Sequence, residues 1–128
     1  MRKEGVHLGL DFVCFLHIMD TIPKNEIRIK KGPMLTGGVV VEITLIGKSG
    51  HGSQPHLSID VISACTDLIV QLHTIVSTKI SSKELLNFSI CQVNSGQAEN
   101  SVPERATIKG VFRYYNKDIG NQCEQLIE

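Results

Sequence analysis

The residue types best able to do chemistry gather in one glycine-rich loop, "GKSGHGSQPH", at residues 47–56. His51 and His56 lie five residues apart there, and the glycines with Pro55 exclude a helical metal-binding pair. An imidazole held in such a loop can donate a hydrogen bond to negative charge that develops during a reaction. The competing interpretation is structural: the glycines allow a tight turn, and His56 caps the helix that follows.

The backbone of this loop offers a second kind of site. A strand is predicted before the loop and a helix after it. N–H groups at a helix N-terminus, together with the helix dipole, favour an anionic oxygen. Composition alone does not separate an anion-binding loop from a simple turn, so both interpretations stay open at this point.

Three other side chains are candidates for binding. Arg113 falls in a predicted strand, on the face opposite the apolar residues, where it is either a solvated charge or a bidentate carboxylate ligand. Asn100 lies in a loop before Pro103, where asparagine commonly makes turn hydrogen bonds. His17 follows an apolar segment and precedes a turn, a position that suits a metal ligand or an ordinary strand end.

Hydrophobic periodicity predicts the elements that must position these residues. Residues 39–48 alternate as a strand with one apolar face, and residues 58–79 carry a helical apolar stripe that Ser58 can cap, with Asp60 near the positive end of the dipole. Strands are predicted at 85–93 and 105–115, and a last helix capped by Asn116 or Asp118 runs to the end of the chain.

This order predicts an α+β fold, a ferredoxin-like split βαβ sandwich. We expect an antiparallel sheet with two helices on one face and with its final strand missing. Upstream, "DFVCFLHI" (11–18) is predicted to be a buried strand and "EIRI" (26–29) another short one. Either could fill the missing place beside residues 39–48, while residues 86–93 should form the other sheet edge.

The composition indicates which classes of binding partner and which cellular compartment to expect for this chain. The 128 residues carry 13 basic and 13 acidic side chains, so there is no electrostatic reason to expect nucleic acid or an anionic membrane. No apolar run approaches the ~18 residues of a membrane span, and Asp11 interrupts the apolar part of a possible signal peptide. Without a CxxC pair, Cys65 and Cys91 are expected to be buried thiols in a reducing cytoplasm.

Two longer stretches resemble a known family. "GKSGHGSQPHLSID" before a long helix, and then "SGQAENSVPERATIKGVFR", resemble the lid or dimerisation domain of the zinc-dependent aminoacylase and carboxypeptidase family. The branch they resemble cleaves N-acyl amino acids, as hippurate hydrolase and the indoleacetyl-amino-acid hydrolases do. The resemblance implies that residues 1–36 are a remnant of the catalytic domain and linker. Residues 37–128 would be the lid, truncated in its last helix.

The resemblance also implies a chemistry and a role for each candidate residue. Two divalent metals, normally zinc, would activate water to attack an amide carbonyl. The lid histidine would reach into the neighbouring subunit and stabilise the oxyanion. The residues that match are His51 as oxyanion donor, Asn100 and Arg113 for the substrate carboxylate, His17 as a metal ligand, and Gly50, Gly52 and His56 for the shape of the loop.

The other metal ligands and the glutamate base of the family are not in this sequence. We therefore expect the chain itself to bind no metal, to be inactive and to form a homodimer, while the parent enzyme takes N-acyl amino acids or peptides. An alternative is a stand-alone ferredoxin-like dimerisation or small-ligand-binding module without catalysis. A weaker one is RNA binding through Tyr115, Lys109 and Arg113.

Overall fold

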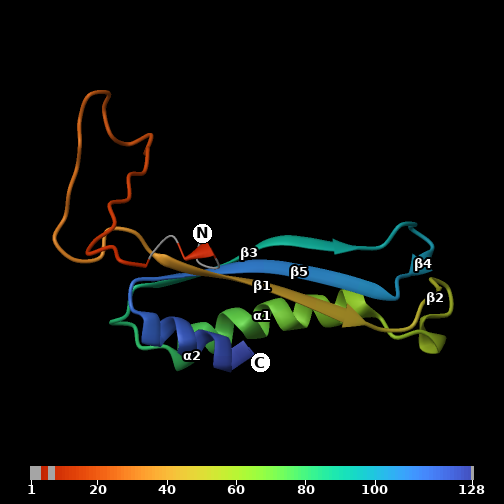
Figure 1. Ribbon diagram of the computed structural model, residues 1–128. Helices are drawn as coiled ribbons and strands as arrows, with labels where there is room; N and C mark the ends of the chain where they lie inside the picture. Colours follow the sequence, from red (N-terminus) through yellow and green to blue (C-terminus); the bar gives the residue numbers. More distant parts are fainter. Residues whose placement is uncertain (1–3, 6–7, 128) are drawn as a thin grey trace. The chain divides into compact units, whose positions relative to one another are not determined.

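The computed structural model describes residues 4–5 and 8–127 and divides the chain into two units, Met1–Gly32 and Pro33–Glu128. The second unit is a three-stranded antiparallel sheet in the order β1 (Gly37–Ile46), β5 (Arg105–Tyr114), β3 (Leu86–Ser95). Both helices, α1 (Val61–Lys79) and α2 (Lys117–Ile127), cover one face of it (Figure 1). This confirms the predicted α+β fold of ferredoxin-like type.

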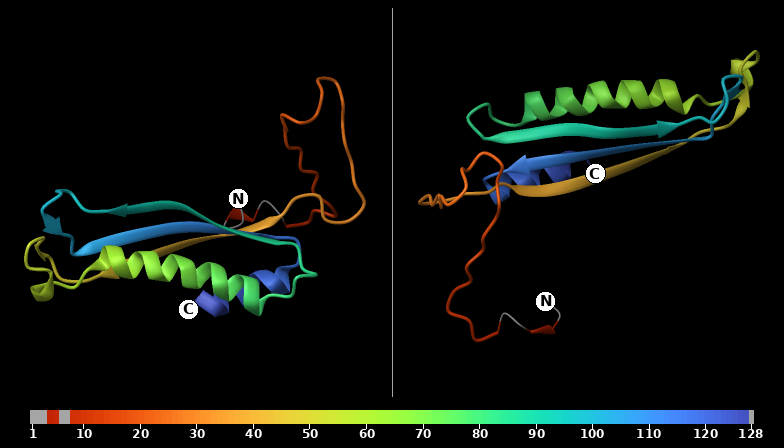
Figure 2. Two further views of the ribbon diagram at one scale, coloured as in Figure 1. Left: turned by 180° about the vertical axis from the view of Figure 1, so that it is seen from behind. Right: turned by 90° about the horizontal axis from the view of Figure 1, so that it is seen from above.

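Three short elements complete the second unit at the end of the sheet away from α2. They are the two-residue strands β2 (Gly50–His51) and β4 (Ser101–Val102) and the 3₁₀ helix η2 (Pro55–Leu57). β2 and β4 pair with each other in a small antiparallel ladder, separate from the main sheet. The views in Figure 2 show this ladder at one end of the long strands, with the connection from β5 to α2 at the other.

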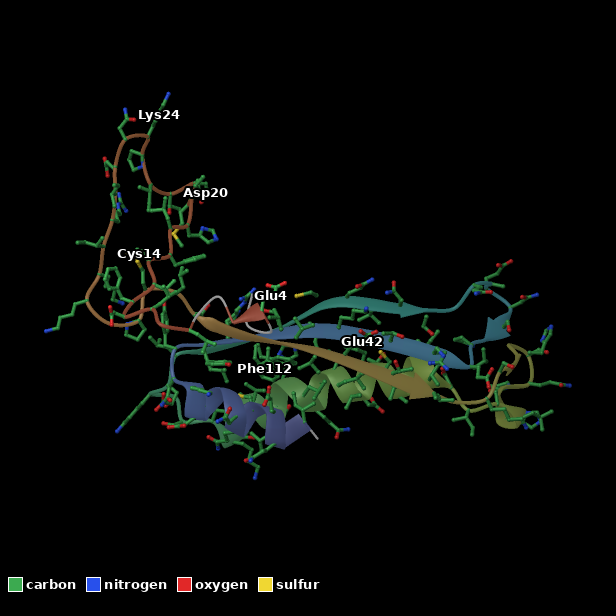
Figure 3. The ribbon with its side chains drawn as sticks, viewed as in Figure 1. Glu4, Cys14, Asp20, Lys24, Glu42 and Phe112 are labelled. Carbon is green, nitrogen blue, oxygen red and sulfur yellow. The ribbon has the colours of Figure 1, made fainter. Side chains whose placement is uncertain are left out.

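Strand β5 is the centre of the core because it has a partner on both sides and helices over one face. Its alternate residues Ala106, Ile108 and Phe112 are 0–1% exposed and point toward the helices. The Phe112 ring, which lies between the sheet and the helices in Figure 3, stacks on Phe88 of β3 at a centroid distance of 4.3 Å. The strand alternation predicted from the sequence is therefore the pattern that builds this core.

Helix α1 packs its apolar stripe, including Val61, Cys65 and Leu72, against the sheet. Its N-cap is Asp60, whose carboxylate accepts the N–H groups of Ile62 (2.8 Å) and Ser63 (3.3 Å). The predicted Ser58 cap is wrong. The Ser58 hydroxyl instead donates to the Pro55 carbonyl at 2.8 Å, which closes η2 before the helix begins.

The cap also changes the acidity of Asp60. The Ser63 hydroxyl, which donates to the carboxylate at 2.6 Å, is the largest cause that holds the pKa of Asp60 below its ordinary value, and the Ile62 N–H adds to it. α2 begins in a similar way, because the Asp118 N–H donates to Asn116 Oδ1 at 3.0 Å. Of the two caps predicted for α2, Asn116 is therefore the correct one.

Helix α1 is also long and apolar enough, by length and composition, to cross a membrane. One such helix is weak support for a span, since the core helix of a soluble protein passes the same test. Its buried stripe faces the sheet, while Ile62 and Val70 on the outer side are 47% and 62% exposed. The helix thus has an apolar face that the described chain leaves uncovered.

The edge strand β3 carries a β-bulge at Cys91. Ile90 pairs with Gly110 and Gln92 with Lys109, so Cys91 is an extra residue without a counterpart in β5. Its thiol is exposed, and the predicted burial of Cys91 is wrong because the bulge and the strand edge leave it uncovered. Cys65 and Cys123 are buried as small apolar groups, and burial raises the pKa of both thiols.

The first unit does not form the two strands predicted for residues 11–18 and 26–29. Its described residues are joined by turns at Met19–Ile22 and Pro23–Glu26. A strand needs a neighbour for its N–H and C=O groups, and neither stretch takes part in a ladder. Its apolar side chains, which suggested burial, are largely exposed: Phe12, Val13, Phe15, Leu16, Ile18, Ile27 and Ile29.

These corrections leave the main sheet with two edges. In the part of the chain that the structure describes, β1 pairs only with β5, and neither N-terminal stretch fills the place beside it. β3 forms the opposite edge, as predicted. Whether residues 1–36 are the end of a catalytic domain stays a prediction.

Candidate functional site

His51 lies in the β2–β4 ladder, directly opposite Ser101. The Gly52 N–H donates to the Asn100 carbonyl at 2.8 Å, which extends the ladder by one more contact. Two predicted site residues, His51 and Asn100, are therefore brought together by backbone pairing although they are far apart in the sequence. The exposed side chain of each belongs to the same small projection at the end of the sheet.

The glycines on either side of His51 are needed for close approach of backbones. A Cβ at Gly52 would lie 3.2 Å from the Asn100 carbonyl oxygen, and one at Gly50 would lie 2.8 Å from Ser58 Cβ. Both contacts are tighter than a side chain normally accepts. This geometry supports the predicted structural role of Gly50 and Gly52.

The His51 ring is held from one side by Ser53. Its Nδ1 lies 3.1 Å from the Ser53 backbone nitrogen, which donates to it, and 2.8 Å from Ser53 Oγ. The ring is exposed, and both hydrogen bonds found for it in residues 8–127 are on Nδ1. Nε2 is thus the nitrogen that can meet an external group.

His56 and the start of α1 do not provide the anion site that the sequence left open. His56 lies in η2 with an exposed side chain, and α1 is capped by Asp60, so His56 does not cap that helix. The Asp60 carboxylate already occupies the first N–H groups of α1, where an external anion would have to bind. A role for His56 in orienting the loop stays a prediction.

Arg113 lies at the opposite end of β5 from this ladder. Arg105, at the ladder end, and Arg113 are eight strand residues apart, which corresponds to about 27 Å at the usual strand rise. Arg113 is exposed on the face that the helices do not cover, opposite Gly38 of β1. Within one chain, the structure does not bring Arg113 to His51 and Asn100.

The helix-free face of the sheet mixes polar and aliphatic side chains and carries no aromatic side chain from β1, β3 or β5. On β5 it presents Arg105, Thr107, Lys109, Val111 and Arg113. Lys109 is paired with Glu42 at 3.1 Å. Tyr115 lies beyond the end of β5. RNA binding by stacking of bases needs aromatic residues on such a face, so that alternative loses its support.

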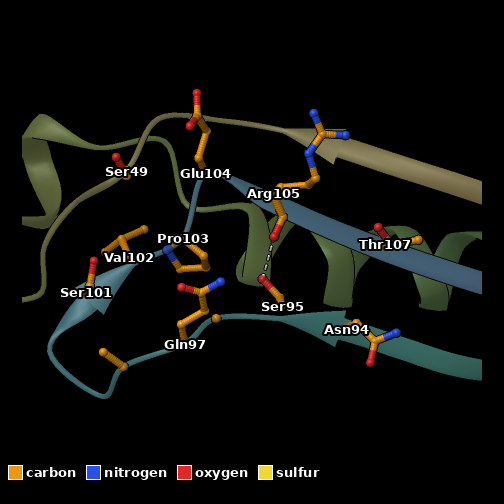
Figure 4. Close-up of a pocket in the computed structure, with 12 residues that line it drawn as sticks. Ser49, Asn94, Ser95, Gln97, Ser101, Val102, Pro103, Glu104, Arg105 and Thr107 are labelled. Carbon is orange, nitrogen blue, oxygen red and sulfur yellow. Dashed lines mark hydrogen bonds between the residues drawn. The ribbon is translucent and has the colours of Figure 1, made fainter.

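A hollow of about 600 Å³ lies beside the ladder, between the turn after β3 and the start of β5 (Figure 4). The Ser95 hydroxyl donates to the Arg105 carbonyl across its wall at 2.9 Å. Polar side chains such as Gln97 and Glu104 line much of it, but neither His51 nor Asn100 does. The hollow therefore borders the ladder through Ser101 and Val102 of β4, but His51 itself does not line it.

His17 belongs to the first unit and is exposed. Its Nδ1 lies 2.6 Å from the Ile18 carbonyl, which can only accept a hydrogen bond, so Nε2 keeps its lone pair. That is the tautomer of a histidine ligand. However, no group of three His, Cys, Asp or Glu side chains that could hold a metal exists in the described part of the chain, so the residues present do not fit a metal centre.

The profile of one protein family, described as the peptidase dimerisation domain, matches residues 35–128. The chain belongs to the peptidase dimerisation domain family. This membership confirms the resemblance read from the sequence, and a dimerisation domain implies self-association.

The dimerisation domain has similar sequences among hydrolases. An N-acyl-L-amino acid amidohydrolase of Geobacillus stearothermophilus is 32% identical over 128 residues, which is 100% of this chain and 35% of the relative. Thermostable carboxypeptidase 2 of Saccharolobus solfataricus is 28% identical over 124 residues, or 97% and 32% of the two chains. The chain thus spans about a third of the length of these relatives.

A solved structure agrees with the fold of the dimerisation domain. A protein from methicillin-resistant Staphylococcus aureus, described as an aminohydrolase, superposes with a TM-score of 0.71 at 26% identity. The match covers 86% of this chain and 30% of that one. The similar proteins, by sequence and by structure, are therefore amidohydrolases and peptidases.

Sequence reasoning missed one residue in the loop and one residue after it. Ser53, which contacts the His51 ring, and Asp60, which caps α1, were not singled out for these roles. A signal existed for both. Serine two residues after a histidine has a short side chain that can reach back, and aspartate is as good an N-cap as serine.

Proposed function

We propose that this chain is the dimerisation and lid portion of a metal-dependent amidohydrolase that cleaves N-acyl amino acids or related amides. His51 supplies a hydrogen bond to the oxyanion that forms on the substrate, and Asn100 and Arg113 hold the substrate carboxylate. The observation that carries the proposal is the presentation of His51 on an exposed, backbone-paired projection, with its Nε2 directed to no group of the described chain.

The separation of the candidate residues supports an arrangement that uses two subunits. His51 and Asn100 lie at one end of the sheet and Arg113 at the other, about 27 Å away along β5. A small N-acyl amino acid cannot touch both ends of one sheet. If His51 and Arg113 contact the same substrate, they come from different chains, and a dimer is then part of the active site.

The chemistry asked of His51 is the donation of a hydrogen bond that strengthens as charge develops. A donor fixed by the backbone needs no reorganisation when the tetrahedral oxyanion forms, and loss of one such donor typically costs about 10²–10³ in turnover. Arg113 can bind a carboxylate through two parallel hydrogen bonds, and the Asn100 amide can add one more. These contacts position the substrate without taking part in bond cleavage.

Most ligands for the metal of such an enzyme would come from outside the described residues, and His17 is the one candidate ligand among those residues. When bound, a divalent metal such as zinc activates water and polarises the amide carbonyl. We expect the purified 128-residue chain to release no amino acid from N-acyl substrates when zinc is added, and to bind no stoichiometric zinc in equilibrium dialysis. Zinc-dependent turnover by the pure chain would contradict this.

The four free thiols support a reducing, cytoplasmic location as part of the proposal.

The test of His51 uses a full-length amidohydrolase that carries these residues as its dimerisation segment. We expect His51→Ala to lower kcat by about 10²–10³ and to leave metal content and melting temperature unchanged, because the lost donor acts when the oxyanion forms. Steady-state kinetics, metal analysis and thermal unfolding measure these quantities. A loss of stability with turnover intact would show that His51 is only structural.

Action across the subunit boundary needs its own experiment. His51→Ala subunits are mixed with subunits whose metal site has been disabled, and both homodimers are nearly inactive. A hybrid dimer combines one intact metal site with one intact His51, so exchange should restore activity at up to one site per hybrid. If native mass spectrometry shows hybrids and no activity returns, His51 does not act in trans.

A further inference from the structure

We infer that Ser53 is a positioning residue that fixes the His51 ring in the tautomer with its proton on Nε2. The inference rests on the proposed function, in which His51 is a hydrogen-bond donor. It adds a residue that acts through His51 and that touches no substrate itself.

The contact with the Ser53 backbone decides the tautomer. A backbone N–H can only donate, and it lies 3.1 Å from His51 Nδ1. If the ring proton were on Nδ1, two N–H groups would face each other at that distance. Nδ1 must therefore carry the lone pair, and in the neutral ring the proton is on Nε2.

The Ser53 hydroxyl reinforces the same choice. Its Oγ lies 2.8 Å from His51 Nδ1, a normal length for an O–H donor. Because Nδ1 already accepts the backbone N–H, the hydroxyl serves as a second donor to it. Two donors from one residue thus hold the ring and mark Nδ1 as the acceptor.

The chain conformation brings Ser53 onto the ring. Gln54 N–H donates to the His51 carbonyl at 2.8 Å, which closes a tight turn over residues 51–54. Gly52 permits this turn to pass close to the Asn100 carbonyl. The backbone of the turn and of the ladder therefore sets the position of Ser53 before any substrate binds.

The tautomer determines what His51 can do. A histidine that coordinates a metal through Nε2 usually donates its Nδ1–H to a carboxylate or carbonyl. His51 has the reverse arrangement, with donors at Nδ1, so its Nε2 offers a proton and not a lone pair. This tautomer lets His51 donate a hydrogen bond to a developing oxyanion, and it leaves Nε2 without the lone pair that a metal would need.

The first test measures the tautomer directly in the 128-residue chain. ¹⁵N NMR of histidine-labelled protein at pH about 9, where an ordinary imidazole is neutral, distinguishes a protonated from an unprotonated ring nitrogen. We expect a higher Nε2–H share for His51 than for His56, which is exposed in the same segment and serves as an internal reference. A predominant Nδ1–H form of His51 would overturn the inference.

Ser53 variants test which residue sets the tautomer. Ser53→Ala keeps the backbone donor and loses the hydroxyl, so we expect the tautomer ratio of His51 to fall by about threefold to tenfold, the usual worth of one hydrogen bond. Ser53→Thr keeps a hydroxyl and should restore the ratio. Gln54→Ala is the matched control, because the Gln54 side chain caps nothing. An unchanged ratio in Ser53→Ala overturns the role of the Ser53 hydroxyl and leaves the backbone N–H as the group that sets the tautomer.

Kinetics separate this inference from the proposed function. In the full-length enzyme, Ser53→Ala should lower kcat by about threefold to tenfold with little change in KM, and Ser53→Thr should recover it. If His51→Ala leaves kcat intact while the tautomer result holds, the oxyanion role fails and the positioning by Ser53 stands. If Ser53→Ala leaves both the tautomer and kcat unchanged, the Ser53 side chain does not position His51.

Discussion

The guanidinium of Arg113 lies over the backbone of Gly38, its cross-strand neighbour in β1. A Cβ at Gly38 would lie 2.7 Å from Arg113 Nη1 and 3.2 Å from Cζ. Because Gly38 has no side chain, the Arg113 guanidinium can lie over its backbone on the helix-free face. Since the obstructed group is the flexible end of an exposed side chain, a methyl group there would move the guanidinium at little cost to the fold.

We expect Gly38→Ala to weaken substrate binding selectively in the full-length enzyme. KM for an N-acyl amino acid should rise by about tenfold, because a displaced guanidinium loses part of a charge-assisted hydrogen bond worth about 1.5–3 kcal/mol. KM for a matched amide without the carboxylate should not change. Equal effects on both substrates would show that Arg113 does not hold the carboxylate.

The neighbouring glycine provides the control for this variant. A Cβ at Gly37 would lie 2.6 Å from Tyr114 Cε2, on a half-buried ring that cannot move freely. Gly37→Ala should lower the free energy of unfolding by about 1–3 kcal/mol through this overlap. It should leave the preference for the carboxylate substrate unchanged.

Single residues show where sequence reading works and where it fails. His51 and Asn100 could be named as candidates from their motifs, and the ladder does bring them together. The predicted strand at 105–115 already places Arg113 eight residues from its start. That His51 and Asn100 lie together near that start could not be read from the sequence, because it depends on the pairing of β2 with β4. The burial of Cys91 was mispredicted because a bulge interrupts the strand alternation.

At the scale of elements, α1 depends on its carboxylate cap. The hydrogen bonds of the Ser63 hydroxyl and the Ile62 N–H lower the pKa of Asp60 below its ordinary value. Because the pKa of Asp60 is lower in the folded state, its ionised side chain stabilises α1 fully at any pH above the pKa of the unfolded aspartate, which is near 4. The stabilisation is lost as the pH falls through the lower, folded pKa.

We therefore expect the melting temperature of the chain to depend on pH through Asp60. Asp60→Asn keeps a capping oxygen but carries no charge, so the wild-type chain should melt higher than this variant at pH about 7. The difference should shrink as the pH is lowered below about 4. Calorimetry of both proteins across this range measures it. A difference that is constant with pH would contradict the role assigned to the charge.

The elements of the second unit could be predicted because their signals are local. The strands β1, β3 and β5 alternate and α1 carries an apolar stripe, so their existence followed from periodicity, while α2 was predicted from its candidate caps Asn116 and Asp118. The first unit was mispredicted for the opposite reason. Residues 11–18 have the composition of a buried strand, but a strand exists only where another strand pairs with it, and composition does not say whether one does.

At the scale of the whole molecule, we expect a second copy to cover the side of the sheet on which α1 and β3 lie. α1 lies on the β3 side of the sheet, as the second view in Figure 2 shows. Val70 on the outer face of α1 is 62% exposed, and Val93 on β3 is 49% exposed. These two side chains and the unpaired edge of β3 belong to the elements on this side of the second unit, and such a side suits an isologous contact.

We expect the 128-residue chain to self-associate through this side. Val70→Glu places a charge on the outer face of α1 and should raise the dimer dissociation constant by at least about tenfold, since burying an unpaired charge is costly. Val40→Glu is the matched control, because Val40 is 77% exposed on the helix-free face. Sedimentation velocity over a concentration series distinguishes the two. A wild-type chain that stays monomeric at high concentration would argue against the surface.

The sheet order also has a consequence for synthesis on the ribosome. Gly37 at the start of β1 pairs with Tyr114, 77 residues later, while β3 and β5 form a hairpin across a short connection. At about 5–20 residues per second, β1 waits roughly 4 to 15 s before its partner is made. During that interval the apolar face of β1 has no partner strand to pack with. We therefore expect chaperones that bind nascent chains to bind this segment. The β3–β5 hairpin can close as soon as it emerges, so we expect β1 to join the sheet no earlier than this hairpin.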